Sequence, residues 1–428
     1  MTERADIVVI GAGAAGLMAA TWAGRSARER GESPDIVVVD GARTLGAKIL
    51  VAGGGRCNVT HHTVDAAQYA GSTQPAIKNV LRRFDVARTV AFFQELDVEL
   101  KREDTGKLFP VTDDARTVLN ALLRAAREAG AKIVHPWRVA AVTREKDGGF
   151  LVHRADIAGR EESIRASAVV LATGGKSLPK SGSDGMGHVM ARSLGHTITE
   201  RVFPSLVPLV VDGARHALKE LSGIALEATV EVRAGTGKVL KRFTNSILIT
   251  HFGYSGPGIL DVSRYYLDAR ASDPDAVLAI NWIPAKSMDA VDGDLQHLGK
   301  RVPWKYLVEH GVPERLARML CAIAGVDAST PGHALSREER RTLVKHVCAM
   351  EVPVSGDRGW NYAEVTAGGV PLAEVDIKTM ESRVCPGLFL VGEICDVDGR
   401  IGGFNFQWAW ATGFVAGTGA ATGARGGG

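Results

Sequence analysis

Short runs of consecutive apolar residues alternate with stretches of helical spacing in the N-terminal part of the chain. The runs DIVVI at 6–10 and IVVV at 36–39 are rich in β-branched residues, which is typical of strands buried on both faces of a parallel sheet. An alanine-rich stretch with good helix propensity separates them. Residues 1–40 therefore predict one β-α-β unit.

The same alternation continues to about residue 175. Apolar residues at helical spacing predict helices over 85–96 and 112–129, the second with Thr112 as its N-cap and Gly130 after its end. Shorter apolar runs predict strands over 138–144, 150–154 and 168–172. This part of the chain therefore predicts further α/β structure.

The pattern changes at about residue 197. Alternation of apolar and polar residues predicts antiparallel strands, as at 228–232 and 246–250, whereas 287–350 is charged and helical in spacing. Strand-like runs return over 370–377 and 388–391, and the glycine-rich segment after Gly417 is expected to be frayed. The predicted organisation is a domain in two parts, 1–195 and 356–428, around an insert at 196–355 that has a β portion (196–285 and 350–355) and a helical portion (286–349).

Composition narrows the class of protein. The chain has 428 residues, 45% hydrophobic and 23% charged, with a formal net charge of +3. Because charges of both signs are mixed and no long basic run occurs, we expect no nucleic-acid partner. The five cysteines form no C-x-x-C pair, and no signal sequence or uninterrupted apolar span is present, so a cytoplasmic protein without a membrane segment is expected.

A glycine loop, G-x-G-x-x-G at 11–16, follows the first predicted strand and opens the first predicted helix. Such a loop lets backbone approach a pyrophosphate, whose charge is met by the free N–H groups at the helix N-terminus. Asp40 ends the second strand, where a carboxylate can accept hydrogen bonds from ribose hydroxyls. The loop and Asp40 together predict a bound dinucleotide.

A second glycine cluster, GEICDVDGRIGGFNF at 392–406, lies near the other end of the chain. FAD is longer than NAD at its reactive end and needs extra loops for its ribityl chain and ring. Glu393, at the end of a predicted buried strand, can bind ribityl hydroxyls, and Gly402-Gly403 allows close backbone approach. FAD is therefore favoured over NAD, with the two clusters as walls of one site.

Blocks spread along the chain resemble one flavoprotein family. They include VVIGAGAAGLMAA, LGAKILVAGGGRCNVT, ATGGKSLPKSGSDGMGH, THFGYSGPGIL, VTAGGV and GLFLVGEICDVDGRIGGFNFQWAWATG. They are similar to blocks of the HI0933-like flavoproteins, which include BaiN-like and aminoacetone-oxidase-type FAD enzymes. The resemblance implies an α/β fold: a glutathione-reductase-like, Rossmann-type FAD-binding domain with an inserted β-barrel and helical domain. The stretch FPSL at 203–206 departs from the family's T-P-x-L, so substrate preference transfers less well than FAD binding.

The resemblance also implies FAD-binding positions along the whole chain. They are Gly11, Gly13, Ala14, Ala15 and Gly16 at the pyrophosphate; Asp40 and Gly41 at the adenosine ribose; Val139 at the adenine; Lys48, Arg56, Cys57 and Asn58 in the loop toward the flavin; Thr173 and Gly174; and Gly392, Glu393, Asp396, Gly403, Asn405 and Phe406 beside the ribityl chain and ring.

Three residues, one thiol and two carboxylates, have alternative interpretations. Cys57 beside Arg56 could be a reactive thiolate, because a cation lowers the pKa of a thiol, but a small residue packed in a glycine loop is favoured. Asp396 and Asp398 could bind a metal, but two acids one residue apart are common on turns, and we expect no metal site.

The loop THFGYSGPG at 250–258 is the best candidate for substrate contact in the insert. His251 and Tyr254 are the candidate proton donors, since a histidine side chain with an ordinary pKa of about 6.5 suits proton transfer near neutral pH. A purely structural histidine is the alternative.

These features predict an FAD-dependent oxidoreductase that transfers hydride between flavin and a small organic substrate. NAD(P)H is a candidate reductant, although no second dinucleotide motif follows a strand. The alternatives are a flavin-dependent RNA-modifying protein, which would show a basic surface, and a flavin-binding sensor without turnover.

Overall fold

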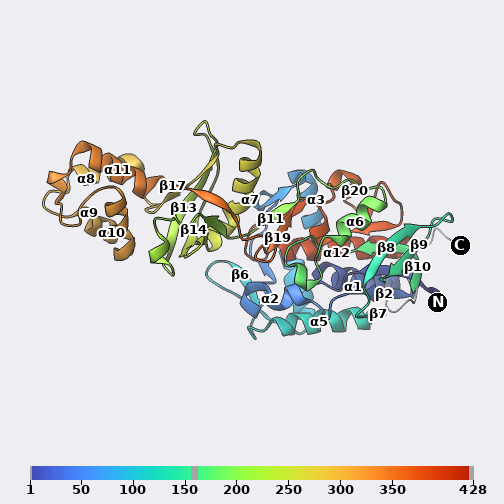
Figure 1. Cartoon of the computed structure of the whole chain (residues 1–428). Coiled ribbons are helices and arrows are strands. Elements are labelled where there is room, and N and C mark those ends of the chain that lie inside the picture. Colours follow the sequence, from blue (N-terminus) through green and yellow to red (C-terminus); the bar gives the residue numbers. More distant parts are fainter. Residues whose placement is uncertain (1, 156–161, 424–428) are drawn as a thin grey trace. The chain divides into compact units, whose positions relative to one another are not determined.

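The structure is a computed structural model that describes residues 2–155 and 162–423. Its contacts divide the chain into unit 1, Met1–Pro204 with Glu364–Gly428, and unit 2, Ser205–Ala363. The boundaries predicted from the sequence, at 195/196 and 355/356, lie slightly nearer the N-terminus at both places. Unit 1 is therefore built from both ends of the chain, as the blue and red elements of Figure 1 show.

A parallel sheet forms the centre of unit 1. Its strands run in the order β22 (Leu388–Leu390), β10 (Ser163–Leu171), β1 (Thr2–Ile10), β2 (Ile36–Val39) and β7 (Ala131–Val134). The pairings between these neighbours are parallel, with Ile7 opposite both Ala168 and Ile36. The side chains of β2 are buried throughout, which explains its continuous run of β-branched residues. The α/β fold class and its Rossmann-type core are confirmed.

Helices from the two ends of the chain pack together against this sheet. A Cβ atom on Gly413 of α12 (Phe404–Gly423) would lie 2.6 Å from the carbonyl oxygen of Ala15 in α1 (Ala14–Glu29), and one on Gly417 would lie 2.3 Å from that of Ala19. Glycine is required for this approach. The expected fraying after Gly417 was wrong, because α12 continues to Gly423 through this contact, whereas residues 424–428 lie outside the described part.

The predicted helices of unit 1 are present with small shifts. α4 covers Val86–Glu95 and α5 covers Ala115–Glu128. The expected N-cap Thr112 was wrong: the carboxylate of Asp114 accepts the N–H of Arg116 instead, and it lies closer to the first turn. The expected strand over 370–377 is largely a 3₁₀ turn at Leu372–Glu374 that follows Pro371, whose missing N–H suits a helix start.

The smaller elements complete unit 1. They are α2 (Ala47–Gly55), α3 (Gln74–Arg83), α6 (Met186–Ser193), β3 (Thr60–His61), β4 (Tyr69–Gly71), β5 (Leu100–Arg102), β6 (Lys107–Pro110), β8 (Val139–Arg144), β9 (Phe150–Arg154), β20 (Val375–Asp376), β21 (Glu381–Ser382) and β23 (Val397–Gly399). Where the chain leaves and returns, β11 (Phe203–Ser205) pairs with β19 (Val365–Ala367).

Unit 2 contains a seven-stranded antiparallel sheet and a helical portion. The strand order is β17 (Met350–Val352), β16 (Val277–Asn281), β13 (Ala225–Arg233), β14 (Val239–Thr250), β15 (Gly253–Ser255), β12 (Leu209–Val211) and β18 (Val354–Asp357). The two edge strands, β17 and β18, are separated by Pro353 alone, so the sheet curls enough to bring these two strand ends together, and its closure into the expected barrel stays a prediction.

Helices flank and extend this sheet. They are α7 (Pro257–Ser272), α8 (Met288–Gln296), α9 (Pro303–Glu309), α10 (Glu314–Ile323) and α11 (Arg337–Cys348). Across residues 2–155 and 162–423, the structure contains no helix that is both long and apolar enough to span a bilayer.

Candidate functional site

The glycine loop lies between β1 and the N-terminus of α1. A Cβ atom on Gly16 would lie 1.8 Å from the carbonyl oxygen of Gly11, and one on Gly11 would lie 2.4 Å from that of Ala172. Around Gly13, by contrast, such an atom would meet nothing within 4 Å, and no side chain caps the helix there. The first turn of α1, with Ala14 and Ala15, therefore presents N–H groups and a positive helix end to open space, which suits an anion.

Asp40 connects the glycine loop to the end of β2. One of its carboxylate oxygens accepts the N–H of Ala12 and the other that of Ala42, both at 2.7 Å. A Cβ atom on Gly41 would lie 2.6 Å from the Arg138 side chain, which immediately precedes Val139 at the start of β8. The structure thus brings Asp40, Gly41 and Val139 into one region beside the glycine loop.

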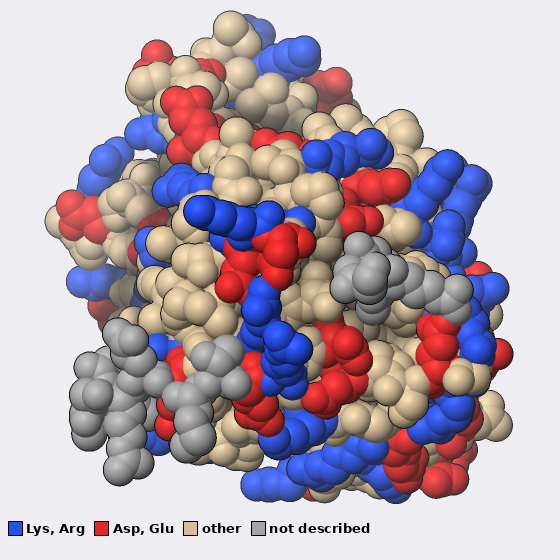
Figure 2. Space-filling model, turned by 90° about the vertical axis from the view of Figure 1, so that its right-hand side faces the viewer, with Lys and Arg blue, Asp and Glu red and all other residues tan. Residues whose placement is uncertain are grey.

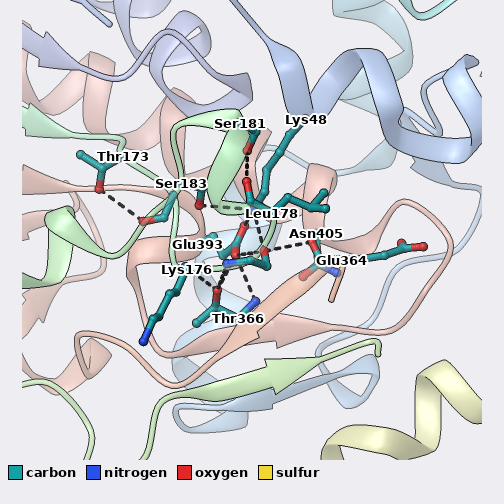
Figure 3. A network of polar contacts seen from close by, with 12 residues as sticks. Lys48, Thr173, Lys176, Leu178, Ser181, Ser183, Glu364, Thr366, Glu393 and Asn405 are labelled. Atoms are coloured by element: carbon teal, nitrogen blue, oxygen red, sulfur yellow. Dashed lines mark hydrogen bonds and ion pairs between the residues drawn. The ribbon is translucent and has the colours of Figure 1, made fainter. Parts of the chain in front are cut away.

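Lys48 and Glu393 form a half-buried ion pair that joins the two ends of the chain. The Lys48 Nζ atom lies 2.6 Å from Oε2 of Glu393, and these side chains are 25% and 17% exposed. Lys48 also donates to the hydroxyls of Ser177 at 2.7 Å and Ser183 at 3.4 Å. Figure 3 shows Lys48, Ser183 and Glu393 converging from three separate segments. The two predicted residues therefore form one charged centre.

Two further residues, missed in the sequence, complete the Glu393 environment. The hydroxyl of Ser177 donates to Oε1 of Glu393 at 2.7 Å. The hydroxyl and the N–H of Thr366 donate to the same atom at 2.7 and 3.0 Å (Figure 3). Burial raises the pKa of the Glu393 carboxyl, but Lys48 and these donors outweigh it and hold that pKa below its usual range. Glu393 is therefore ionised at neutral pH.

Gly175 lies against Thr366 and is a local sign in the sequence that another segment approaches here closely. A Cβ atom at Gly175 would lie 2.4 Å from Oγ1 of Thr366 and 3.0 Å from Oε1 of Glu393. The segment Thr173-Gly174-Gly175 therefore needs glycine at its last position, because any side chain there would overlap Thr366 and Glu393.

Thr173 and Gly174 follow β10 and reach the same network. A Cβ atom on Gly174 would lie 2.6 Å from the Ser183 hydroxyl, which accepts from Lys48. One on Gly187 would lie 1.8 Å from Oγ1 of Thr173. Both predicted residues are therefore packed tightly against the segment that carries Ser183.

The loop at 53–58 places its three predicted residues in different environments. Arg56 pairs with Glu103 at 2.6 Å and lies over the ring of Phe109 at 4.0 Å. Cys57 is fully buried with φ 60°, and burial raises the pKa of its thiol to about 12. Asn58 is buried, and its Oδ1 atom has no hydrogen-bond partner among the described residues. An unsatisfied acceptor in this loop is consistent with a missing polar ligand.

Cys57 is expected to be unreactive in the native protein. Because its thiol stays protonated well above neutral pH and is inaccessible, a disulfide reagent at pH 8 should leave it unmodified. Mass spectrometry of the labelled protein checks this, with urea-unfolded protein as the control in which all five cysteines react. Rapid labelling of Cys57 in the folded protein would support the reactive-thiolate alternative.

The C-terminal glycine cluster begins directly against the N-terminal loop. A Cβ atom on Gly392, at φ 71°, would lie 3.0 Å from Cβ of Ala15. The Gly392 N–H donates to the Thr412 hydroxyl at 3.0 Å, and its carbonyl accepts from the indole of Trp408 at 3.1 Å. Helix α12 therefore holds the second cluster at the first turn of α1.

The rest of the cluster is fixed by α12 and β3. The Asn405 side chain accepts the Gly399 N–H at 2.8 Å and donates to the Gly399 carbonyl at 3.0 Å. A Cβ atom on Gly403 would lie 2.6 Å from the carbonyl carbon of Thr60. Asn405 and Gly403 thus hold the loop itself, and contact of either with a cofactor stays a prediction.

Asp396 and Phe406 stand at the two ends of the segment 396–406. The Asp396 carbonyl accepts the Ser72 N–H at 2.8 Å, while Phe406 stacks on Trp410 with centroids 5.5 Å apart. Both side chains are half-buried. Over residues 2–155 and 162–423, no group of three or more His, Cys, Asp or Glu side chains is arranged to hold a metal ion.

The two candidate proton donors of unit 2 differ in environment. His251 is exposed in the turn between β14 and β15. Tyr254 is 2% exposed in the apolar core of unit 2, where it packs against His216 at 5.3 Å, and burial raises the pKa of its phenol. The expected loop at 250–258 contains the strand β15, so the burial of Tyr254 is consistent with a packing role. A catalytic role for Tyr254 or for the exposed His251 stays a prediction.

The donor set of unit 1 fits a dinucleotide with a flavin. The open first turn of α1 suits a pyrophosphate, Asp40 suits a ribose, and the Glu393 centre with Asn58 suits a polyhydroxyl chain and a polar ring edge. These groups come from both ends of the chain, as an extended cofactor requires.

Comparison with known proteins gives matches along the whole chain. A model of the HI0933-like protein Rossmann domain matches residues 5–419. A 3-dehydro-bile acid delta(4,6)-reductase of Clostridium scindens is 33% identical over 419 residues, which cover 97% of this chain and 98% of that protein. A ribosomal RNA dihydrouridine synthase of Escherichia coli is 29% identical over 412 residues, which cover 96% of each chain.

A solved structure also shares the fold. An E. coli quinol fumarate reductase matches with a TM-score of 0.52 at 16% identity, covering 100% of this chain and 72% of that one. At this identity the likeness concerns the fold alone.

Proposed function

The chain belongs to the HI0933-like family of flavoproteins and is an FAD-dependent oxidoreductase, and we propose that it reduces a carbon–carbon double bond conjugated with a carbonyl group in a small organic substrate. FAD would supply the two-electron, hydride-transfer chemistry that no side chain of the protein can provide. The cofactor would lie along unit 1, with its pyrophosphate at Gly11–Gly16 and its ribityl chain at the Lys48–Glu393 centre.

We infer the type of reaction from the names of the two relatives. One reduces delta(4,6) double bonds of a 3-dehydro-bile acid, and the other makes dihydrouridine. Each product has two more hydrogen atoms across a carbon–carbon double bond, and in each substrate that bond is conjugated with a carbonyl group. Since both relatives match this chain almost end to end, the shared chemistry is the best-supported reaction for it.

The protein's residues would bind, orient and exclude water. The N–H groups at the start of α1 bind phosphate oxygens, and Asp40 and ionised Glu393 accept hydrogen bonds from hydroxyl groups. Bound FAD would supply the hydride for the substrate carbon remote from the carbonyl, and the adjacent carbon would gain a proton. A reduced nicotinamide nucleotide would restore the reduced flavin.

The test is reduction of a conjugated ketone by the purified protein. We expect a yellow protein whose FAD is bleached anaerobically by NADH or NADPH and reoxidised by 2-cyclohexenone, with cyclohexanone as the product. The matched control is cyclohexanone itself, which lacks the double bond and should not reoxidise the flavin. A protein whose reduced flavin is reoxidised by no conjugated carbonyl compound would refute the proposed reaction.

Reduction of uridine in RNA is the second candidate function, because the E. coli relative carries that name. Positive and negative side chains are interspersed on the face of the molecule in Figure 2, without the extended basic area typical of RNA-binding surfaces. Incubation of the reduced protein with unmodified ribosomal RNA, followed by mass spectrometry for dihydrouridine, distinguishes this candidate from reduction of a free small molecule.

A further inference from the structure

Arg358 lies between two aromatic rings in unit 2. Its guanidinium carbon is 4.3 Å from the ring centroid of Phe252 and 3.8 Å from that of Tyr362. Tyr362 is 52% exposed, and Phe252 and Arg358 are half-buried. The exposed His251 packs edge-on against Phe252 at 5.2 Å. These four residues form an aromatic and cationic cluster that includes the candidate acid of the sequence analysis.

The backbone on both sides of the cluster is fixed. The Arg358 N–H donates to the Pro208 carbonyl at 3.1 Å, and the Gly359 N–H donates to the Asp357 carboxylate at 2.6 Å. On the other side, the Phe252 carbonyl accepts the Val211 N–H at 2.9 Å. The backbone is fixed by these hydrogen bonds and the guanidinium is packed between the two rings, which lowers the entropic cost of binding a ligand there.

No carboxylate in the described part of the chain forms an ion pair with Arg358. The carboxylate of Asp357, next to it, accepts a backbone N–H. Arg318 offers a useful contrast: it lies over Trp304 at 3.7 Å in the same unit, but its Nε atom is paired with Glu314 at 2.8 Å. Arg358 keeps its planar set of donors free for another acceptor.

We propose that Arg358, held between Phe252 and Tyr362, binds the carbonyl or carboxylate group of a flat, conjugated substrate. The planar guanidinium can donate two parallel, charge-assisted hydrogen bonds to the oxygen atoms of such a group. The exposed ring of Tyr362 gives the flat part of the substrate an apolar face. This inference rests on the proposed function and adds to it the group that recognises the substrate.

Calorimetric titration with trans-cinnamate, a flat conjugated carboxylate, tests the site without relying on catalysis. Arg358→Met is expected to weaken binding by about 10- to 100-fold, since a charge-assisted hydrogen bond is lost. Arg358→Lys, which keeps the charge but not the forked geometry, should lie in between. Cinnamyl alcohol, which lacks the carboxylate, should bind weakly to the wild type and the variants alike.

Arg318→Met is the matched control, because it removes a stacked arginine of the same unit that already has a carboxylate partner. It should leave cinnamate affinity unchanged. Equal affinity of the wild type and both Arg358 variants for cinnamate, or failure of the wild type to prefer cinnamate over the alcohol, would overturn the proposal. Binding that depends on Arg358 in a protein that reduces no conjugated carbonyl would instead refute the reaction and leave the site standing.

Discussion

Replacement of Glu393 by alanine is expected to lower the free energy of unfolding by about 3 kcal/mol. The change leaves the ammonium of Lys48 half-buried without a counter-ion and removes the shared acceptor of Ser177 and Thr366. On folding, each of these groups loses hydrogen bonds to water. In the wild type, a hydrogen bond to the Glu393 carboxylate replaces them, and in the variant nothing does. Urea unfolding of the cofactor-free variant and wild type at pH 7 measures the difference.

The matched control for this change is Glu3→Ala. Lys132 and Glu3 also form a Lys–Glu pair, at 2.5 Å, but their side chains are 58% and 52% exposed. Water solvates both charges in either state, so we expect a loss of less than about 1 kcal/mol. Similar losses for the two variants would contradict a special role for the Glu393 network.

The effect of Glu393→Ala should also depend on pH. The pKa of the folded-state carboxyl is held below its usual value, so its contribution is fully present above the unfolded-state pKa of about 4.3 and is lost as the pH falls through the folded pKa. The difference between wild type and variant should therefore shrink in acid, below about pH 4. A difference that grows on acidification would mean that Glu393 is protonated in the native state.

Local patterns in the sequence predicted several strands of the nine-stranded sheet of unit 1 well. The strand over 36–39 and that over 150–154 have the predicted bounds, because continuous or alternating burial leaves a direct record in the residue types. The glycine loop was equally clear, since Gly11 and Gly16 are each required by a close backbone contact. The strands follow from the residue types of adjacent positions, and the glycine loop follows from backbone contacts that leave no room for a side chain.

Polar contacts between distant segments could not be predicted from local sequence patterns. Ser177 and Thr366 both reach Glu393, but they belong to segments far apart in the chain, and neither lies in a periodic pattern. The strand that contains Tyr254 was missed for a related reason. Its glycine neighbours indicated a flexible loop, whereas a Cβ atom on Gly253 would lie 2.3 Å from the Leu209 carbonyl of the adjacent strand. Glycine there serves strand packing, which the sequence alone does not distinguish from flexibility.

Gly13→Ala is expected to abolish FAD binding and leave the fold intact. A Cβ atom at Gly13 meets no protein atom within 4 Å, and the φ of −85° is one that alanine adopts readily. In the proposed complex, that open space is where the pyrophosphate approaches the backbone, so the added methyl group would exclude it. The variant should purify colourless, with a far-UV spectrum and thermal midpoint equal to those of cofactor-free wild type.

Gly16→Ala is the companion variant, and it should behave differently. Its Cβ atom would lie 1.8 Å from the Gly11 carbonyl oxygen, so the loop and α1 must move apart, and we expect a loss of stability even without cofactor. The comparison separates two uses of glycine in one motif: Gly16 lets the protein pack against itself, and Gly13 lets a ligand approach. FAD titration followed by flavin fluorescence measures binding for both variants. Retention of wild-type FAD affinity by Gly13→Ala would remove the first turn of α1 from the cofactor site, whatever the stability of Gly16→Ala.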